Sequence, residues 1–101
     1  MRMLLNVVIP HEPFNSLVRK GTAGALLGKI LDELRPEAVY FTELDGRRGV
    51  TLVVDVENPA QVPRFCEPFF LSFNADCKLR IVMGPDDLQR AGLDQLGKKW
   101  A

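Results

Sequence analysis

The order of strand-like and helix-like segments constrains the fold of this chain more than any other feature of its sequence. Four short runs are rich in the β-branched, aliphatic or aromatic residues typical of strands, and they span residues 3–9, 38–44, 50–56 and 77–83. Helix formers dominate residues 13–34 and 59–73, which separate the first two runs and the last two runs. The chain is therefore predicted to run as strand, helix, strand, strand, helix, strand.

Proline and glycine indicate where the helices begin, break and end. Pro13 opens the first helix, and Pro36 ends it because the residue before a proline is disfavoured in the helical region. The apolar face of this segment changes direction near Gly21, so we expect a kink or a break there. Pro63 and Pro68 lie inside the second helical pattern and predict a helix that is bent or split into short pieces.

A short C-terminal helix is predicted to start at Gly84-Pro85, after the last strand. Leu88, Leu96 and Trp100 are the apolar side chains available to hold it against the rest of the chain. The whole order, β-α-β-β-α-β plus a terminal helix, is that of the ferredoxin-like α+β fold, a four-stranded antiparallel sheet with helices on one face. A chain of 101 residues fits one domain, residues 1–101.

Alternation along the strands predicts a sheet with one face almost wholly apolar and an opposite face that mixes polar groups with several large apolar ones. The face expected under the helices collects Leu5, Val7, Ile9, Val39, Phe41, Val50, Leu52, Val54, Leu79, Ile81 and Met83. The opposite face collects Leu4, Asn6, Val8, Tyr40, Thr42, Thr51, Val53, Asp55, Lys78, Arg80 and Val82. Burying each Val or Leu is worth ~1.5–3 kcal/mol, and no helix is left to cover this second face. We therefore expect a two-fold homodimer joined sheet to sheet.

In its strand order, its length and its two-sided sheet, the chain resembles the dimeric α/β-barrel superfamily. Residues 37–43 and 45–49, with Asn74-Ala75-Asp76, are most similar to small uncharacterised bacterial members of that superfamily. The superfamily includes antibiotic-biosynthesis-type monooxygenases, muconolactone isomerases and stress-responsive barrel proteins. The resemblance implies a dimeric α/β barrel built from the ferredoxin-like fold, and it does not imply one particular reaction.

Three polar side chains are candidates for catalytic work. His11 is the one histidine and lies at the mouth of the first helix, where a neutral-pH proton carrier can reach a cleft edge. Glu43 ends the second strand, where desolvation would suit it to act as a general base. Asn6 is the single polar residue within the first strand. The alternatives are an exposed loop histidine, a solvated rim glutamate and an asparagine bonded within the sheet or across an interface.

The densest aromatic cluster is either a core stripe or the wall of a pocket between the helices and the sheet, where the resemblance implies a small apolar ligand. The predicted ligand-binding residues are Phe14, Tyr40, Glu43, Phe65, Phe69 and Phe70. We therefore expect a small dimeric protein that binds a small apolar ligand or acts as a scaffold. The alternative is a cofactor-independent monooxygenase or isomerase acting on a small aromatic or lactone substrate.

The composition of the chain limits the classes of molecule that it is expected to bind. Thirteen Lys and Arg balance thirteen Asp and Glu, so no net field favours nucleic acid or an anionic membrane. The longest apolar runs are far shorter than the ~20 residues that cross a bilayer, and the first residues lack a secretion signal. We expect a cytoplasmic protein with no nucleic-acid or membrane partner. Cys66 and Cys77 lack metal-site spacing and are interpreted as small buried hydrophobes, with a disulfide or a metal site as the alternative. We expect no metal and no cofactor.

Overall fold

Four strands form one antiparallel sheet in the order β2-β3-β1-β4. The computed structural model describes all residues, Met1–Ala101. The strands are β1 (Arg2–Ile9), β2 (Ala38–Leu44), β3 (Arg47–Asp55) and β4 (Asp76–Ile81). The helices are α1 (His11–Lys20), α2 (Ala23–Leu34), α3 (Val62–Phe73), α4 (Pro85–Arg90) and α5 (Leu93–Trp100), with a short 3₁₀ turn, η1 (Pro59–Gln61), before α3. The order confirms the predicted ferredoxin-like α+β fold with a C-terminal helical segment.

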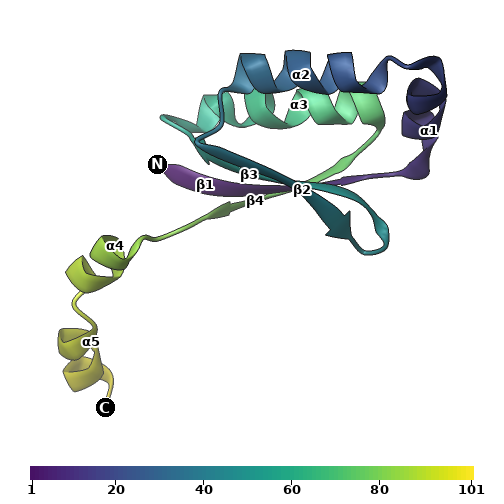
Figure 1. The fold of residues 1–101 in the computed structure, drawn as a ribbon. Coiled ribbons are helices and arrows are strands. Elements are labelled where there is room, and N and C mark those ends of the chain that lie inside the picture. Colours follow the sequence, from purple (N-terminus) through teal and green to yellow (C-terminus); the bar gives the residue numbers. More distant parts are fainter.

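The core lies between the sheet and the helices α2 and α3, which run side by side over one face (Figure 1). Alternate residues of β1 and β3 point into it, as the period of two along a strand requires. The most deeply buried large side chains are Phe65, Phe69, Phe73, Leu5, Ile9, Leu52, Val7, Val50 and Val54. The Phe73 ring packs edge-on against Phe14 with centroids 5.1 Å apart, which is a favourable aromatic geometry. No helix is both long and apolar enough to span a membrane.

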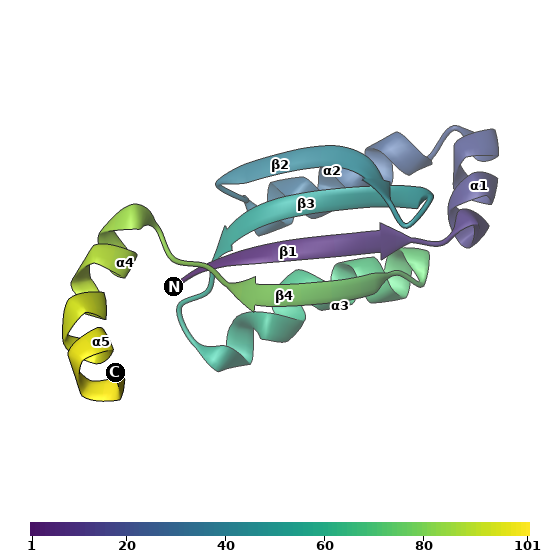
Figure 2. The same cartoon turned by 90° about the horizontal axis from the view of Figure 1, so that it is seen from below.

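The predicted break in the first helical segment is confirmed. Gly21 ends α1 with a left-handed backbone (φ 75°), which glycine adopts at little cost, and α2 starts two residues later. Glu12 has an extended backbone (φ −113°), so the regular part of α1 begins at Pro13 as predicted. Figure 2 shows α1 beyond the end of the sheet where β1 stops, while α2 turns back over the sheet.

The predicted splitting of the second helix is wrong, because α3 runs without interruption from residue 62 to 73. Pro63 lies in its first turn, where a backbone N–H has no partner within the helix, so this proline removes nothing. Pro68 lies inside the helix and forfeits one backbone hydrogen bond. The burial of Phe65, Phe69 and Phe73 on one side of α3 outweighs that loss.

Three side chains predicted to lie under the helices are exposed instead: Phe41 at 59%, Ile81 at 63%, and Met83. Phe41 and Ile81 belong to β2 and β4, which are the two edges of the sheet. The helices cover mainly the central strands, so only inner positions of the edge strands, such as Val39 and Leu79, pack against the core. Alternation predicted the face of each side chain correctly but not its distance from the helices.

The predicted docking of the C-terminal helix is also wrong. It consists of two helices, α4 and α5, separated by Gly92 with a left-handed backbone (φ 72°), and it projects away from the sheet (Figure 1). Leu88, Leu96 and Trp100 are therefore exposed. The radius of gyration is 17.1 Å, against about 13 Å for a compact chain of this length. We refer to residues 85–100 as the C-terminal arm and to the remainder as the body.

We predict that Phe69→Ala lowers the free energy of unfolding by about 3–5 kcal/mol, the range for removing a fully buried phenylalanine. Phe69 has no exposed surface, whereas Leu71 on the same helix is 82% exposed. Leu71→Ala is the matched control and should change stability by less than about 0.5 kcal/mol. Urea unfolding of both variants measures the difference, and equal effects would contradict the position of the core.

Candidate functional site

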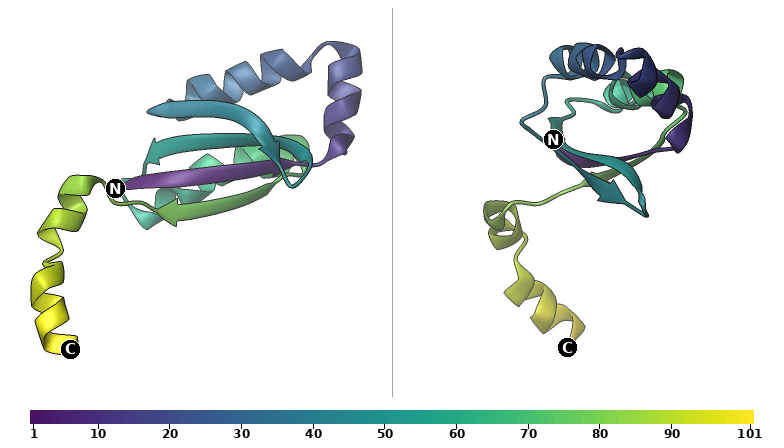
Figure 3. Two further views of the ribbon diagram at one scale, coloured as in Figure 1. Left: turned by 60° about the horizontal axis from the view of Figure 1, so that its bottom comes forward. Right: turned by 45° about the vertical axis from the view of Figure 1, so that its right-hand side comes forward.

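The face of the sheet opposite α2 and α3 carries no helix, as Figure 1 and the right view of Figure 3 show. Strand register places Leu4, Asn6 and Val8 of β1 on this face, beside Thr51 and Val53 of β3. All five are half-buried by their neighbours on the sheet alone. The predicted division of the central strands into two faces is confirmed. We refer to this surface as the open face.

One line of polar side chains crosses the open face from edge to edge. Asn6 lies opposite Thr51 on one side and Lys78 on the other, and Thr51 lies opposite Tyr40. Residues directly opposite one another on antiparallel strands share a face, so these four side chains form a single line perpendicular to the strands. We refer to Tyr40, Thr51, Asn6 and Lys78 as the polar row.

Two members of the polar row, Thr51 and Asn6, bond to one another, whereas Lys78 and Tyr40 have no partner within the chain. The Thr51 hydroxyl donates to Asn6 Oδ1 at 2.8 Å, which fixes the orientation of the amide and leaves its Nδ2 group free to donate. None of the four ion pairs of the chain includes the Lys78 ammonium group. The Tyr40 side chain is 69% exposed. The row therefore offers an amide donor, a cation and a phenol to a group placed on the sheet.

Apolar side chains flank the polar row on both sides. Leu4 and Val53 lie opposite one another in the next row towards the N-terminal end of β1. On the other side, Val8 lies opposite Gly49, and the Leu44 side chain lies across that glycine. A Cβ built on Gly49 would be 2.6 Å from Leu44 Cγ, so any larger residue there would displace the leucine. The middle of the open face is thus apolar on both sides of the polar row, while Arg80, Asp76 and Thr42 lie in the same flanking rows on the edge strands.

The three catalytic candidates do not converge. Asn6 lies in the middle of the open face, in the polar row. Glu43 is exposed, and its Oε2 accepts a hydrogen bond from the Gly46 backbone N–H at 2.8 Å, so it stabilises the turn between β2 and β3. His11 is exposed at the start of α1. Beside it, the hydrogen bond from the Ser16 hydroxyl is the main cause that lowers the pKa of Glu12.

The predicted phenylalanine pocket between helices and sheet has no counterpart among the hollows of the structure. Phe65 and Phe69 are core residues. Phe14 packs under the Arg48 guanidinium, which lies 4.8 Å from the ring centroid, and Phe70 faces solvent. None of the four hollows found is lined by any of these side chains. Of the predicted site residues, Asn6 and Tyr40 are the two that lie together on one surface.

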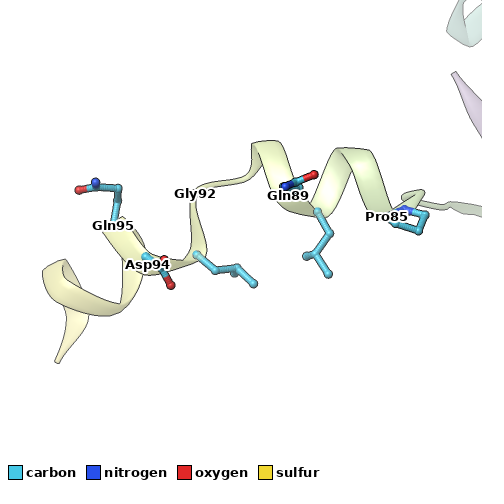
Figure 4. A pocket seen from close by; sticks show the side chains of 7 residues that line it. Pro85, Gln89, Gly92, Asp94 and Gln95 are labelled. Carbon is cyan, nitrogen blue, oxygen red and sulfur yellow. The ribbon is translucent and has the colours of Figure 1, made fainter.

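One hollow lies on the arm, at the bend between α4 and α5. Figure 4 shows it from close by, with Pro85 and Gln89 on α4 and Asp94 and Gln95 on α5 around the bend at Gly92. It has a volume of about 540 Å³ and lies wide open to solvent. It is too open to bury most of a small ligand's surface, as a small-ligand pocket does.

The two thiols pack beside one another at the edge of the core. Cys66 is buried and Cys77 is half-buried, and the Cys77 Sγ donates a weak hydrogen bond to the Cys66 carbonyl oxygen at 3.9 Å. Burial, followed by the neighbouring thiol, raises the pKa of Cys77 to about 12. Burial also raises the pKa of Cys66. Both groups therefore remain neutral thiols at physiological pH.

Comparison with known proteins supports the fold. The sequence matches no family model and no curated protein. Among solved structures, the chain is similar to 5-chloro-2-hydroxyhydroquinone dehydrochlorinase (TftG) from Burkholderia phenoliruptrix AC1100, in complex with 2,5-dihydroxybenzoquinone. The TM-score is 0.56 at 19% identity, and the match covers 86% of this chain and 99% of that chain. At this identity the likeness concerns the fold alone.

We predict that Cys77 reacts with a thiol reagent about 100-fold or more slowly than free cysteine at pH 8, because little thiolate is present when the pKa is about 12. The rate should keep rising through pH 10 rather than level off, since the pKa lies above that range. Unfolding in guanidinium should restore ordinary reactivity. With a thiol reagent that releases a coloured group, absorbance measures the rate of the reaction with Cys77. Fast labelling of the folded protein at pH 8 would contradict the burial of the thiol.

Proposed function

We propose that this chain forms a cytoplasmic homodimer through its open face and binds a small, largely apolar ligand that carries oxygen groups, such as a hydroxylated ring, at the polar row. The observation that carries the proposal is an uncovered surface with apolar side chains at its middle, crossed by a row in which the Asn6 amide N–H, Lys78 and Tyr40 are free to bond a ligand. Each half of the proposal rests on a different part of that surface.

The proposed dimerisation follows from the apolar part of the open face. Leu4, Val8 and Val53 are each worth ~1.5–3 kcal/mol when fully buried, and in one chain they are only partly covered. A second copy supplies an equal apolar surface of the same width, and a two-fold pairing uses one patch twice. Two sheets stacked in this way lie about 10 Å apart, which is the usual separation in packed sheets.

Strand register favours one orientation of the pair. With the two-fold axis along the strands, β1 of one copy lies over β3 of the other, because these two strands form the middle of the sheet. Leu4 then faces Val53 of the partner subunit, and Asn6 faces Thr51 of the partner subunit. Lys78, on edge strand β4, faces the partner's Tyr40. In this orientation no charged side chain of the open face meets a like charge of the partner subunit.

The ligand class follows from the polar row. Between two open faces, the Asn6 amide and the Lys78 ammonium group are donors, and the Tyr40 hydroxyl is a donor and an acceptor. Hydrogen bonds to a charged donor contribute more than neutral ones, so a phenolate, carboxylate or quinone oxygen is the group that this row suits. The flanking Leu4, Val8 and Val53 suit the apolar part of a small ring. The quinone bound by the similar dehydrochlorinase belongs to this chemical class.

Catalysis is the second candidate, and one observation favours it: the similar solved structure is an enzyme that acts on a hydroxyhydroquinone. In this chain the titratable groups of the polar row are Lys78 and Tyr40, while His11 and Glu43 lie elsewhere. Cofactor-independent oxidation or isomerisation would therefore have to use the row itself. Incubation of the protein with a ring ligand and analysis of the products distinguishes turnover from binding.

We predict that Val53→Lys turns the dimer into a monomer, because it places an unpaired ammonium group in the middle of the buried interface. Leu71→Lys is the matched control, since Leu71 is an equally apolar but exposed residue on the outer side of α3. Sedimentation velocity at micromolar concentration should give one chain for the first variant and two for the control and the wild type. A wild-type protein that sediments as one chain would remove the proposal.

We also predict that Lys78→Ala weakens binding of 2,5-dihydroxybenzoquinone about tenfold or more, as loss of a charge-assisted hydrogen bond implies. Asn6→Ala should weaken it to a similar or smaller degree. Lys29→Ala, which removes an exposed lysine on α2, is the control and should change nothing. Isothermal titration calorimetry measures the affinities, with the dimer mass checked for each variant. Equal binding by all three variants would place the ligand elsewhere.

A further inference from the structure

The C-terminal arm is a pair of helices that the rest of the chain leaves uncovered. Leu93, Leu96 and Trp100 of α5 are spaced by three and four residues, so they share one face of the helix, and all three are exposed. Helices shorter than ~12–15 residues are marginal in water without packing. The two helices of the arm have six and eight residues. The arm therefore needs a surface against which its apolar face can pack.

The arm lies on the side of the sheet that the proposed partner would occupy. Figure 1 and the right view of Figure 3 show α4 and α5 on the side opposite α2 and α3, past the end of β4. At 1.5 Å per residue the two helices span about 21 Å. Two packed layers of about 10 Å each separate one sheet from the helix layer of a partner stacked on its open face. The arm is thus long enough to reach that helix layer.

An apolar hollow, matching the apolar face of α5, lies at the end of the body from which the arm projects. It has a volume of about 200 Å³ and lies where β1 starts and β3 ends, and its lining residues are Met1, Met3, Val56, Glu57, Asn58, Pro59 and Val62. This volume is below the ~300–1,000 Å³ of typical small-ligand pockets and suits one large apolar side chain. With the two-fold axis along the strands, the hollow of one copy and the arm of the other lie at the same end of the dimer.

Charge favours the same pairing. Lys98 and Lys99 lie near the tip of the arm, and neither forms an ion pair with a carboxylate of its own chain. Glu57 lines the hollow and is likewise unpaired. A basic tip placed over an acidic rim is attracted, and the attraction adds to the apolar contact.

We propose that the arm of each copy embraces a second copy of this chain, with the apolar face of α5 over the partner's hollow and Lys99, which flanks that face, beside Glu57 of the partner subunit. This inference rests on the proposed homodimer, since only a partner on the open face brings the hollow within reach. In such a dimer each chain contacts the other through its arm as well as through its open face. Leu96 and Trp100 supply the apolar contact, and Lys99 sets the position of the tip.

Trp100 is the single tryptophan of the chain, so its fluorescence reports on the arm alone. In the wild-type dimer we expect the emission maximum of Trp100 to lie at a shorter wavelength than in the unfolded chain. Acrylamide should quench this emission only weakly. Leu96→Asp should shift the emission to the red, increase the quenching and raise the dimer dissociation constant about tenfold or more. Gln95→Asp adds the same charge to the polar face of α5. It should leave the emission wavelength, the quenching and the dimer dissociation constant unchanged.

Disulfide formation identifies the surface that the arm contacts. Chains carrying Glu57→Cys and chains carrying Lys99→Cys should form a covalent dimer when mixed and oxidised, whereas neither chain alone should do so. The mass from sedimentation is measured on the same samples. A wild-type dimer with a fully solvated Trp100 overturns the proposed arm contact but leaves the proposed dimer intact, whereas a wild-type monomer overturns both. A link that forms within one chain carrying both substitutions, and never between chains, also overturns the proposed arm contact.

Discussion

Both faces of the sheet carry large apolar side chains, but the helices α2 and α3 cover only one of them. Strand β1 shows the constraint most clearly, because six of its residues from Met3 to Ile9 are apolar and only Asn6 is polar. An antiparallel strand with one solvated face normally alternates apolar and polar side chains, whereas a near-continuous apolar run is typical of a strand covered on both sides. The sequence of β1 is therefore that of a strand buried on two sides, while the single chain covers it on one.

This constraint relates three features that are far apart in the sequence. The open face, the polar row and the C-terminal arm all lie on the side of the sheet that the helices leave free (Figure 3). One partner placed on that side covers the apolar residues, encloses the polar row and meets the arm. A ligand would then be held between two sheets, where the field of Lys78 is screened less than it is at an exposed surface. The proposed function and the proposed dimer thus depend on the same surface.

Much of the fold could be predicted from the sequence because local rules decided it. The order of elements followed from residue types, and the break at Gly21 from the need for a left-handed backbone at a helix end. The uninterrupted α3 was missed because tertiary burial of Phe65, Phe69 and Phe73 outweighs the hydrogen bond that Pro68 lacks. The same helical spacing placed Phe70 on the outer side, so a stricter use of the periodicity would have excluded it from any pocket.

The candidate site was harder to predict because it depends on cross-strand register. Asn6 was recognised as the one polar residue in its strand, but Lys78 and Thr51 become its neighbours only once the pairing of β1 with β4 and β3 is known. A slip of one residue in that pairing would move either neighbour to the other face. The exposure of Phe41 and of the arm depends on where the helices end over the sheet, which no local pattern specifies.

Small-angle X-ray scattering of the full chain across a dilution series tests the central claim most directly, since it reports particle mass and overall dimensions together. The account predicts a forward intensity that corresponds to twice the 11.3 kDa of one chain at micromolar concentration and above. A forward intensity of one chain at every concentration, with a radius of gyration near the 17.1 Å of the isolated protein, would show that solvent covers the second face. That result would contradict the account.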